Sequence, residues 1–542
     1  MDMLPVASNV AEPLTTARRI DHLIQAWTAR GLHRRHAAVR GRPSLLSISI
    51  RSAVTSRRRQ ARCDEPSMAL STLDGALCVC CVVVPMPESQ PRLPASGASA
   101  SRPPPLPTAQ MRLTSFDGST SVEASTCRPD RGRHWAALAA RGPLTIRGGG
   151  YSYAPASLGS ESLHIDMRAW RGVVDFDRTT GILEVEAGMS LGEVHRLASP
   201  AGWHLPSQPG YPEITVGGCI AGDVHGKNQH LAGNFRHCVR AIDLWHPDHG
   251  VLHLTKGDDL FELTSGGLGL TGVILSAVLQ LERLVSHTVV VTTSPIEDAV
   301  STPLALRAGS ASLFSYTWQN FTCRSRVGRG VVYGAEYSQE ALCVQKDQRY
   351  TTLNPQKRGW PVNVMGYPTI AALNAVYELS QRFGGDRRPV GLLDFLFPAA
   401  RKATYFKMFG RRGFHEAQAL IPHLHAADYL GALAELARAR RAPVALASCK
   451  LFSGASKFVR FDGEGIVVAV NAPRDDRGAD FVANVHRLML EHHGRPNLLK
   501  DSLLAADTVA ASVCGVDDFR AALLDFDPAR RFRSVLADRL GL

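Results

Sequence analysis

Two histidines, an aspartate and a lysine lie within nine residues in the stretch GDVHGKNQH, residues 222–230. A metal site there would need Asp223 and His225 to find a third ligand, and His230 belongs to the same short loop. A His/Asp relay would need a nucleophile, but no serine or cysteine stands in a G-x-S-x-G context. We therefore expect no metal at this loop. We interpret it as backbone that follows a large cofactor, with His230 as a solvated loop residue.

Three glycine-rich segments favour the cofactor interpretation. The first, RGGGYSY at 147–153, follows an expected strand, and its three glycines let backbone N–H groups approach an anion. It is not a dinucleotide fingerprint, because no G-x-G-x-x-G opens a helix there, and a plain tight turn remains the alternative. The second, at 209–230, interleaves glycine with apolar residues, which suggests backbone against a flat, partly buried ligand. The third, TSGGLGLTGVI at 264–274, leads into a strand.

In this order and spacing the three segments resemble the flavin-binding domain of the vanillyl-alcohol-oxidase (PCMH-type) family. TVGGCIAGDVHGKNQHLAGNF, residues 215–235, is the most specific stretch. LIPH at 420–423, CKLFSG at 449–454 and GRPNLLKDS at 494–502 resemble the branch of that family that oxidises polyprenylphosphoryl ribose. The likeness runs from about residue 111 to residue 542 and includes nothing before it.

The resemblance implies FAD as the cofactor, bound without a covalent link. Family members that attach FAD covalently often have a histidine directly after the glycine turn, where this chain has Tyr151. Asn497 falls where the resembled branch has a tyrosine that contacts the flavin. The positions that match FAD contacts are Arg147, Gly148, Gly149, Gly150, Tyr151, Ser152, Tyr153, Gly210, Thr215, Val216, Gly217, Gly218, Gly222, Asp223, Val224, His225, Val273 and Asn497.

Lys500, in NLLKDS, matches the lysine that the family needs for activity. A cation beside the flavin can hydrogen-bond the reacting oxygen and stabilise the negative charge that hydride transfer creates. Without the resemblance Lys500 would be read as an ordinary surface lysine. Leu396 replaces a tyrosine of the resembled branch, and Ala469 replaces a reactive cysteine, which puts the exact substrate in question. The positions that match the substrate pocket are Lys227, which would point to a substrate phosphate, and Trp318, Leu396, Gln418, Lys450 and Phe452.

The elements that must position these residues form an α+β fold. GVVDFD and GILEVEAG read as strands joined by a turn, and Ser190 with Glu193 has the spacing of a capping box at a helix start. We expect further strands at 272–284 and 464–473 and helices at 428–440 and 478–494. The predicted organisation is a split PCMH-type FAD-binding domain, 111–285 plus a returning segment at 495–542. A substrate domain of antiparallel sheet plus helices, 286–494, is inserted in it.

Residues 1–110 are rich in arginine, serine and proline and cannot supply a packed core. We expect a disordered extension, or a start assigned too far upstream with Met111 as the true start. Much of the net charge of +12 lies there. The 11 cysteines are scattered apart from CVCC at 78–81, which indicates reduced thiols. The longest apolar run has about ten residues, too few to span a bilayer, and no secretory signal is evident. We expect a cytoplasmic protein or one in peripheral contact with a membrane.

The resemblance implies oxidation of a secondary alcohol on a sugar. The branch suggests the 2′-hydroxyl of a polyprenylphosphoryl-β-D-ribose, oxidised to a 2′-keto intermediate during arabinan synthesis for the cell wall. A separate NAD(P)H-dependent short-chain reductase would then complete an epimerisation. The alternatives are an oxygen-using sugar, lactone or alditol oxidase of the same family and a flavin-binding scaffold without catalysis. A nucleic-acid binder would rest on residues 1–110 alone, and we expect no nucleic-acid partner.

Overall fold

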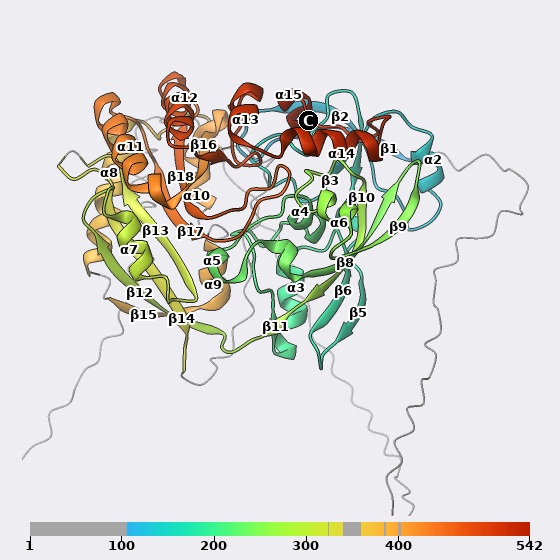
Figure 1. Ribbon diagram of the computed structural model, residues 1–542, viewed down its shortest axis with the longest axis horizontal. Helices are drawn as coiled ribbons and strands as arrows, with labels where there is room; N and C mark the ends of the chain where they lie inside the picture. Colours follow the sequence, from blue (N-terminus) through green and yellow to red (C-terminus); the bar gives the residue numbers. More distant parts are fainter. Residues whose placement is uncertain (1–105, 324, 340–358, 384–385, 399–402) are drawn as a thin grey trace, which may run out of the picture. The chain divides into compact units, whose positions relative to one another are not determined.

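A computed structural model describes residues 106–323, 325–339, 359–383, 386–398 and 403–542 (Figure 1). These ranges fold into four β-sheets with helices between and around them, so the predicted mixture of helix and sheet is confirmed. In Figure 1 the eight-stranded sheet is on the left and the five-stranded sheet on the right. None of the helices in the described ranges is long and apolar enough to cross a membrane.

A four-stranded sheet carries the first glycine segment. Its order is β1 (Thr108–Thr114), β2 (Ser121–Cys127), β4 (Leu163–Asp166) and β3 (Leu144–Arg147), and β3 ends where the glycine turn begins. Strand β1 starts three residues before Met111, and Leu106 before it is buried. The folded region therefore begins inside the predicted extension.

A five-stranded antiparallel sheet lies beside it, in the order β5 (Val173–Asp177), β6 (Ile182–Glu186), β10 (Val273–Gln280), β8 (Val239–His246) and β9 (Gly250–Thr255). Leu183 and Val185 are fully buried, as their alternation with glutamates predicted. Helix α3 (Leu191–Ala198) begins with the predicted capping box. The strand expected at 272–284 is divided, because β10 ends at Gln280 and β11 (Glu282–Arg283) pairs with β7 (Trp203–His204) in a separate two-stranded sheet.

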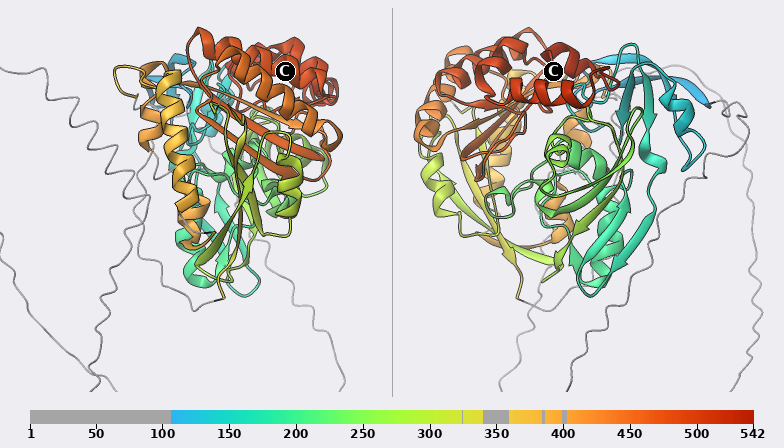
Figure 2. Two further views of the ribbon diagram at one scale, coloured as in Figure 1. Left: turned by 90° about the vertical axis from the view of Figure 1, so that its left-hand side faces the viewer. Right: turned by 45° about the vertical axis from the view of Figure 1, so that its right-hand side comes forward.

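The eight-stranded antiparallel sheet has two different faces. Its order is β15 (Arg387–Gly391), β12 (Thr288–Ile296), β14 (Arg329–Tyr337), β13 (Phe314–Asn320), β17 (Leu446–Phe452), β18 (Gly465–Pro473), β16 (Phe414–Ile421) and β19 (Arg495–Pro496). Helices α7 (Thr302–Ala308), α11 (Ala426–Arg440) and α12 (Asp476–Glu491) form one hydrophobic core with one face of it (Figures 1 and 2).

The alternation of side chains along these strands decides which residues reach the other face. Ala417 and Ala419 of β16, Cys449 of β17, and Val468 and Val470 of β18 all belong to the core under the helices. Because successive side chains of a strand point to opposite faces, the residues between them project from the opposite face, which we call the inner face. In β16, β17 and β18 these are Glu416, Gln418, Ser448, Lys450, Phe452, Val467, Ala469 and Asn471.

The C-terminal segment leaves this sheet and joins the third glycine segment. Arg495 and Pro496 still pair with β16, so residue 495, the predicted boundary, belongs to the edge strand of the eight-stranded sheet. Helices α13 (Ala506–Ser512), α14 (Val516–Phe526) and α15 (Val535–Leu540) share a core cluster with Leu263, Leu268 and Leu270. The residues between β19 and α13 include Lys500, which therefore lies on the link between the two groups of elements.

Candidate active site

The glycine turn after β3 offers backbone amides to a ligand. A Cβ on Gly148 would collide with the Thr215 hydroxyl, and one on Gly149 would lie 2.6 Å from the Glu213 carbonyl oxygen. Gly150 has φ +73°, a conformation that glycine adopts without strain. Within the described ranges the N–H groups of Gly148, Gly149 and Gly150 donate no hydrogen bond. Consecutive unused amides of this kind form anion-binding concavities, so the turn fits the predicted FAD contact.

The second glycine segment uses its amides inside the protein. It forms helix α4 (Val216–Ala221), whose N-cap Thr215 accepts a hydrogen bond from the N–H of Gly218 at 3.2 Å. The N–H groups of Val216 and Gly217 donate to two carbonyls just before α3, at 2.8 Å each. A Cβ on Gly222 would lie 2.7 Å from Cδ1 of Leu499, so glycine here lets the segment with Lys500 approach.

Asp223 is an internal charge partner of this segment. It is 1% exposed, and its carboxylate accepts hydrogen bonds from the Arg236 guanidinium, the Arg236 N–H at 3.0 Å and the Asn234 amide at 3.2 Å. Arg236 also donates to Asp462 at 2.7 Å. The N–H of the next residue, Val224, donates to the Cys219 carbonyl, and the Val224 carbonyl accepts from the N–H of Phe235. These contacts fix the loop that precedes His225.

His225 lies beside the charged part of the inner face. Its ring centroid is 4.8 Å from that of Phe452 and 6.1 Å from that of Phe461. Burial, and then the positive charge of Lys450, hold the pKa of His225 well below its usual value. The imidazole is therefore neutral at physiological pH and can donate or accept a hydrogen bond without adding charge.

Lys500 lies between an aromatic ring and a carboxylate. Its Nζ is 3.7 Å from the centroid of the Tyr153 ring and 3.8 Å from Oε1 of Glu416, and its side chain is 30% exposed. Glu416 is 8% exposed and accepts a hydrogen bond from Asn471 Nδ2 at 2.7 Å. We did not predict Glu416 or Asn471. The signal in the sequence was the strand alternation that places Glu416 on the same face as Gln418.

A network of polar contacts fixes the backbone that carries Lys500. Asn497 donates from Nδ2 to Gln418 Oε1 at 2.6 Å, and its Oδ1 accepts from the N–H of Leu499 at 3.1 Å. The N–H of Lys500 donates to the Asn497 carbonyl at 3.0 Å. On the other side Asp501 pairs with His486 of α12 at 2.6 Å. Asn497 thus positions the Lys500 segment, a role that the side chain of tyrosine would not fill in the same way.

The residues after the glycine turn also dock on this segment. The N–H groups of Tyr153 and Ala154 both donate to the Leu499 carbonyl at 3.0 Å, and the Ser152 hydroxyl lies 3.3 Å from the same oxygen. Tyr151 packs 5.5 Å from Phe116, ring to ring. The first glycine segment and the lysine segment are therefore joined by direct hydrogen bonds.

Three other residues that match FAD contacts lie in different surroundings. Arg147 donates to the Ser157 hydroxyl at 3.0 Å, and burial lowers its pKa to about 10. Val273 is completely buried at the start of β10. At Gly210 the nearest atoms to an added Cβ belong to Leu396 and Pro398 at 4.0 Å, so a side chain would fit there.

Lys450 and Phe452 project from β17 toward the same group of residues. Burial, and then the nearby Lys500, lower the pKa of Lys450 to about 8, and Glu416 opposes the shift. Ala469 of β18 is paired with Gln418 on one side and Ser448 on the other, so it lies in the row between the two polar strands. The structure thus brings together Gln418, Lys450, Phe452, His225 and Lys500.

The other three residues that match the substrate pocket have different neighbours. Lys227 donates to the Phe395 carbonyl, and its Nζ is 4.1 Å from the Phe395 ring. Leu396, at the end of α9 (Leu392–Leu396), is buried in the main core. Trp318 packs 4.6 Å from Tyr377 of α8 (Tyr367–Phe383), ring to ring, and lines a separate cavity of about 260 Å³.

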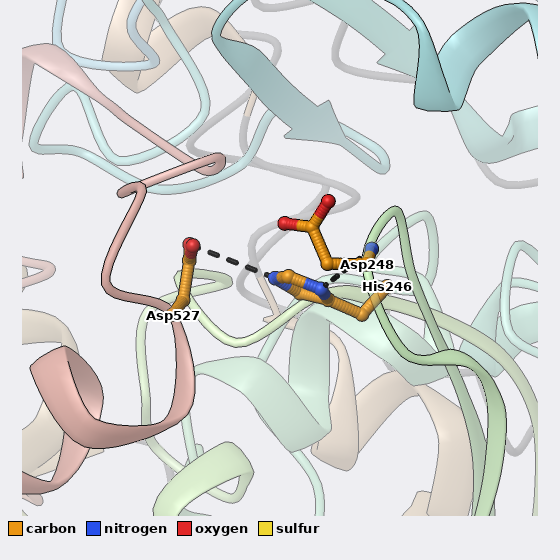
Figure 3. Close-up of side chains that lie close together, drawn as sticks. All are labelled: His246, Asp248 and Asp527. Carbon is orange, nitrogen blue, oxygen red and sulfur yellow. Dashed lines mark hydrogen bonds and ion pairs between the residues drawn. The ribbon is translucent and has the colours of Figure 1, made fainter.

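Among the described residues, one group of three could bring metal ligands together: His246, Asp248 and Asp527 (Figure 3). The N–H of Asp248 donates to Nδ1 of His246 at 3.2 Å. Nδ1 is therefore an acceptor, and a neutral ring must carry its proton on Nε2, which faces Asp527 at 3.6 Å. A protonated nitrogen has no lone pair for a metal, so this arrangement favours a His–Asp pair between the β8–β9 turn and the end of α14.

Comparison with known proteins places this geometry in context. Residues 134–255 match the family described as an FAD binding domain. A decaprenylphosphoryl-β-D-ribose oxidase of Mycolicibacterium smegmatis is 29% identical over 452 residues, which cover 80% of this chain and 95% of the relative. An uncharacterized protein of Streptomyces coelicolor is 29% identical over 369 residues, 64% of this chain and 100% of the relative. A Δ(24)-sterol reductase of Rattus norvegicus is 30% identical over 111 residues, 20% of this chain and 22% of the relative.

The described residues fit FAD on structural grounds as well. Unused amides at 148–150 suit an anionic group such as the pyrophosphate of FAD, and a lysine cation lies next to the backbone that follows them. The matched region contains both the glycine turn and α4. Residues 134–255 therefore match an FAD-binding domain, and the chain is similar to PCMH-type (vanillyl-alcohol-oxidase) FAD-binding oxidoreductases.

Proposed function

We propose that this protein oxidises a secondary alcohol of a sugar, namely the 2′-hydroxyl of a polyprenylphosphoryl-β-D-ribose, to the ketone. The observation that carries the proposal is the grouping of Lys500, Lys450, Gln418 and His225. These four residues lie in or next to four separate segments that resemble the polyprenylphosphoryl-ribose oxidases. Similarity to the decaprenylphosphoryl-β-D-ribose oxidase over 80% of the chain supports the same substrate class.

FAD, when bound, supplies a hydride acceptor. The chain supplies charge and hydrogen bonds around the reacting alcohol. The Lys500 ammonium can donate to the carbinol oxygen, and Gln418 is held by Asn497 beside it. Neutral His225 and the Phe452 ring border the charged pair and limit the access of water to it. Exclusion of water strengthens the electrostatic contribution of Lys500.

The cofactor is expected to be noncovalent, because Tyr151 follows the glycine turn. Denaturation with acid or heat should release FAD into the supernatant. Colour that remains with the precipitated chain would contradict this. We also propose that the FAD domain is split, with residues 286–494 inserted as the substrate domain.

A polyprenylphosphoryl substrate requires groups for its phosphate and for its lipid. Lys227 is our proposed phosphate ligand, and it would have to leave the Phe395 carbonyl to act as one. Peripheral contact with a membrane would give access to the lipid. The ketone would pass to a separate NAD(P)H-dependent short-chain reductase, since hydride addition from the opposite face completes an epimerisation.

A screen of prenylphosphoryl pentoses against the yellow holoprotein, without oxygen, tests this proposal. Bleaching of the flavin absorbance by the ribose compound is the expected result. The same incubation in air tests the alternative of an oxygen-using sugar, lactone or alditol oxidase, because such an enzyme would release stoichiometric peroxide. No bleaching by any pentose would contradict the proposed substrate class.

A further inference from the structure

We infer that Glu416 is a positioning residue that acts through Lys500 and Lys450. Its carboxylate holds the Lys500 ammonium against the Tyr153 ring and favours the cationic form of the neighbouring Lys450. This inference rests on the proposed role of Lys500 in the function above. It adds a residue that neither the sequence motifs nor the resemblance had singled out.

The geometry places Glu416 where it can do this. Its Oε1 is 3.8 Å from Lys500 Nζ, which also lies 3.7 Å from the centroid of the Tyr153 ring. Its Oε2 accepts from Asn471 Nδ2 at 2.7 Å. Asn471 is itself paired with Glu416 in the register of β16 and β18, and its Oδ1 lies 3.4 Å from the Tyr405 hydroxyl. The carboxylate is therefore fixed from behind, and its free oxygen faces the lysine.

Electrostatics explain why such a carboxylate is needed. Two lysine cations in a partly buried site repel each other, and burial adds a cost for each. The groups that face the pair are Glu416 from β16, Tyr153 from the loop after β3 and His225 from the 222–230 loop. Tyr153 and His225 are neutral at physiological pH, because burial raises the pKa of Tyr153 well above its usual value and lowers that of His225. Among these groups Glu416 supplies the negative charge.

The sign of the effect follows directly. An anion near an amine favours the protonated form, so removal of the anion favours the neutral amine. Glu416→Gln keeps the shape and still accepts from Asn471, but it removes the charge. Lys450, whose pKa is already lowered to about 8, should then be neutral in a larger fraction of molecules at pH 7. Because only a neutral amine reacts with acetic anhydride, the amines themselves report the change.

The test is competitive acetylation of the FAD-loaded protein with a trace of acetic anhydride, followed by mass spectrometry of each lysine. In Glu416→Gln the acetylation rate of Lys450 at pH 7 should rise about fivefold, since loss of a nearby opposite charge lowers the pKa of an amine by one unit or more and the pKa of Lys450 is about 8. Glu416→Asp, which retracts the carboxylate, should give a smaller rise. Glu186→Gln is the matched control. Glu186, at the end of β6 in the five-stranded sheet, is a similarly buried carboxylate, and it pairs with Arg131 and not with a lysine.

Equal acetylation rates in wild type and in both Glu416 variants would overturn the inference. If Glu416→Gln does not fold, Glu416→Asp provides the same comparison. The experiment needs no sugar substrate, so its failure is separate from that of the proposed function. A rise in acetylation with no bleaching by any pentose would support the role of Glu416 and contradict the proposed substrate class. Where bleaching occurs, the alkaline limb of its pH profile should move to lower pH in Glu416→Gln.

Discussion

The region around the glycine turn and the inner face of the eight-stranded sheet offer different chemistry to a ligand. The turn at 148–150 contributes backbone amides, and the side chains next to it are packed into the protein. The inner face contributes side chains on paired strands, a lysine, a glutamate and amides, and Lys500 of the segment after β19 lies next to them. This difference indicates that binding of the cofactor depends on backbone geometry, whereas reaction with a substrate depends on individual side chains. Substitutions should separate the two.

The first and second glycine segments also differ from each other in how their backbone amides are used. Both have dense glycine, and both matched FAD contacts. The amides at 148–150 are unused within the described ranges, whereas those of Val216, Gly217 and Gly218 are already bonded inside the protein. Glycine density therefore predicts close approach of backbone, but the partner can be a ligand or another part of the chain.

The largest effect is expected at Lys500. Lys500→Ala should keep FAD but slow flavin reduction by substrate by about 10²–10³-fold, the loss typical of one positioned donor in a water-poor site. Lys500→Arg should also fail, because the planar guanidinium does not replace a compact ammonium. Anaerobic stopped-flow absorbance, with bound FAD quantified in parallel, measures both. Lys256→Ala, at an exposed lysine, is the control; bleaching at the wild-type rate in Lys500→Ala would remove Lys500 from the mechanism.

A substitution in the glycine turn at 148–150 should instead weaken the binding of FAD. Gly149→Ala places a Cβ 2.6 Å from a backbone carbonyl oxygen, which cannot move as a flexible side chain does. We expect FAD affinity to fall about tenfold or more, in line with the cost of overpacking, while the protein remains folded. Fluorescence titration of apoprotein with FAD gives the affinity. Gly142→Ala, where no atom lies within 4 Å of the added Cβ, should bind FAD normally.

The pH dependence of substrate binding should report Lys450. Its pKa is lowered to about 8, so the amine is cationic below that pH and becomes neutral as the pH rises through it. For an anionic, phosphorylated substrate KM should rise about tenfold across this range, since a hydrogen bond to a charged group contributes ~1.5–3 kcal/mol. Lys450→Gln should have a high KM that no longer changes near pH 8. A wild-type KM that stays constant from pH 7 to 9 would show that the charge of Lys450 does not contribute to substrate binding.

The smallest effect is expected at the N-terminus. A chain that begins at Met111 should fold and hold FAD, because the remaining four residues of β1 keep most of the pairing with β2. It loses buried Leu106 and three residues of β1, so its melting temperature should be a few degrees below that of a chain that begins at Leu106 (about 2–4 °C per kcal/mol lost). Thermal melts of both chains give the comparison. If the chain that begins at Met111 is insoluble and the chain that begins at Leu106 is soluble, residues 106–110 are essential for folding.

Sequence patterns predicted the regular elements that have one apolar face. The alternation at Leu183 and Val185 and the capping box at Ser190 are present as expected. Helix α8 was not predicted, because its buried positions include Asn374 and Glu378, which hide the apolar period. Helix α12 ends at Glu491, earlier than the expected end at Gly494, because His493 already adopts φ +54°.

The candidate site was predictable only in part. The motifs led to Lys500, Lys450 and Gln418, which the structure brings near one another. Motifs could not lead to Glu416, because its role depends on the pairing of β16 with β18 and on the approach of a segment about 80 residues later in the chain. Contacts between distant segments are set by tertiary packing, which local patterns do not report.

The most direct test of the account is anaerobic reaction of the FAD-loaded protein with two matched compounds, a polyprenylphosphoryl-β-D-ribose and its 2′-deoxy analogue. We expect the ribose compound to bleach the flavin and to yield the 2′-ketone, detected by mass spectrometry after trapping with a hydrazine. The 2′-deoxy compound should bind without bleaching. Equal bleaching by both compounds, or bleaching by neither, would contradict oxidation at the 2′-position.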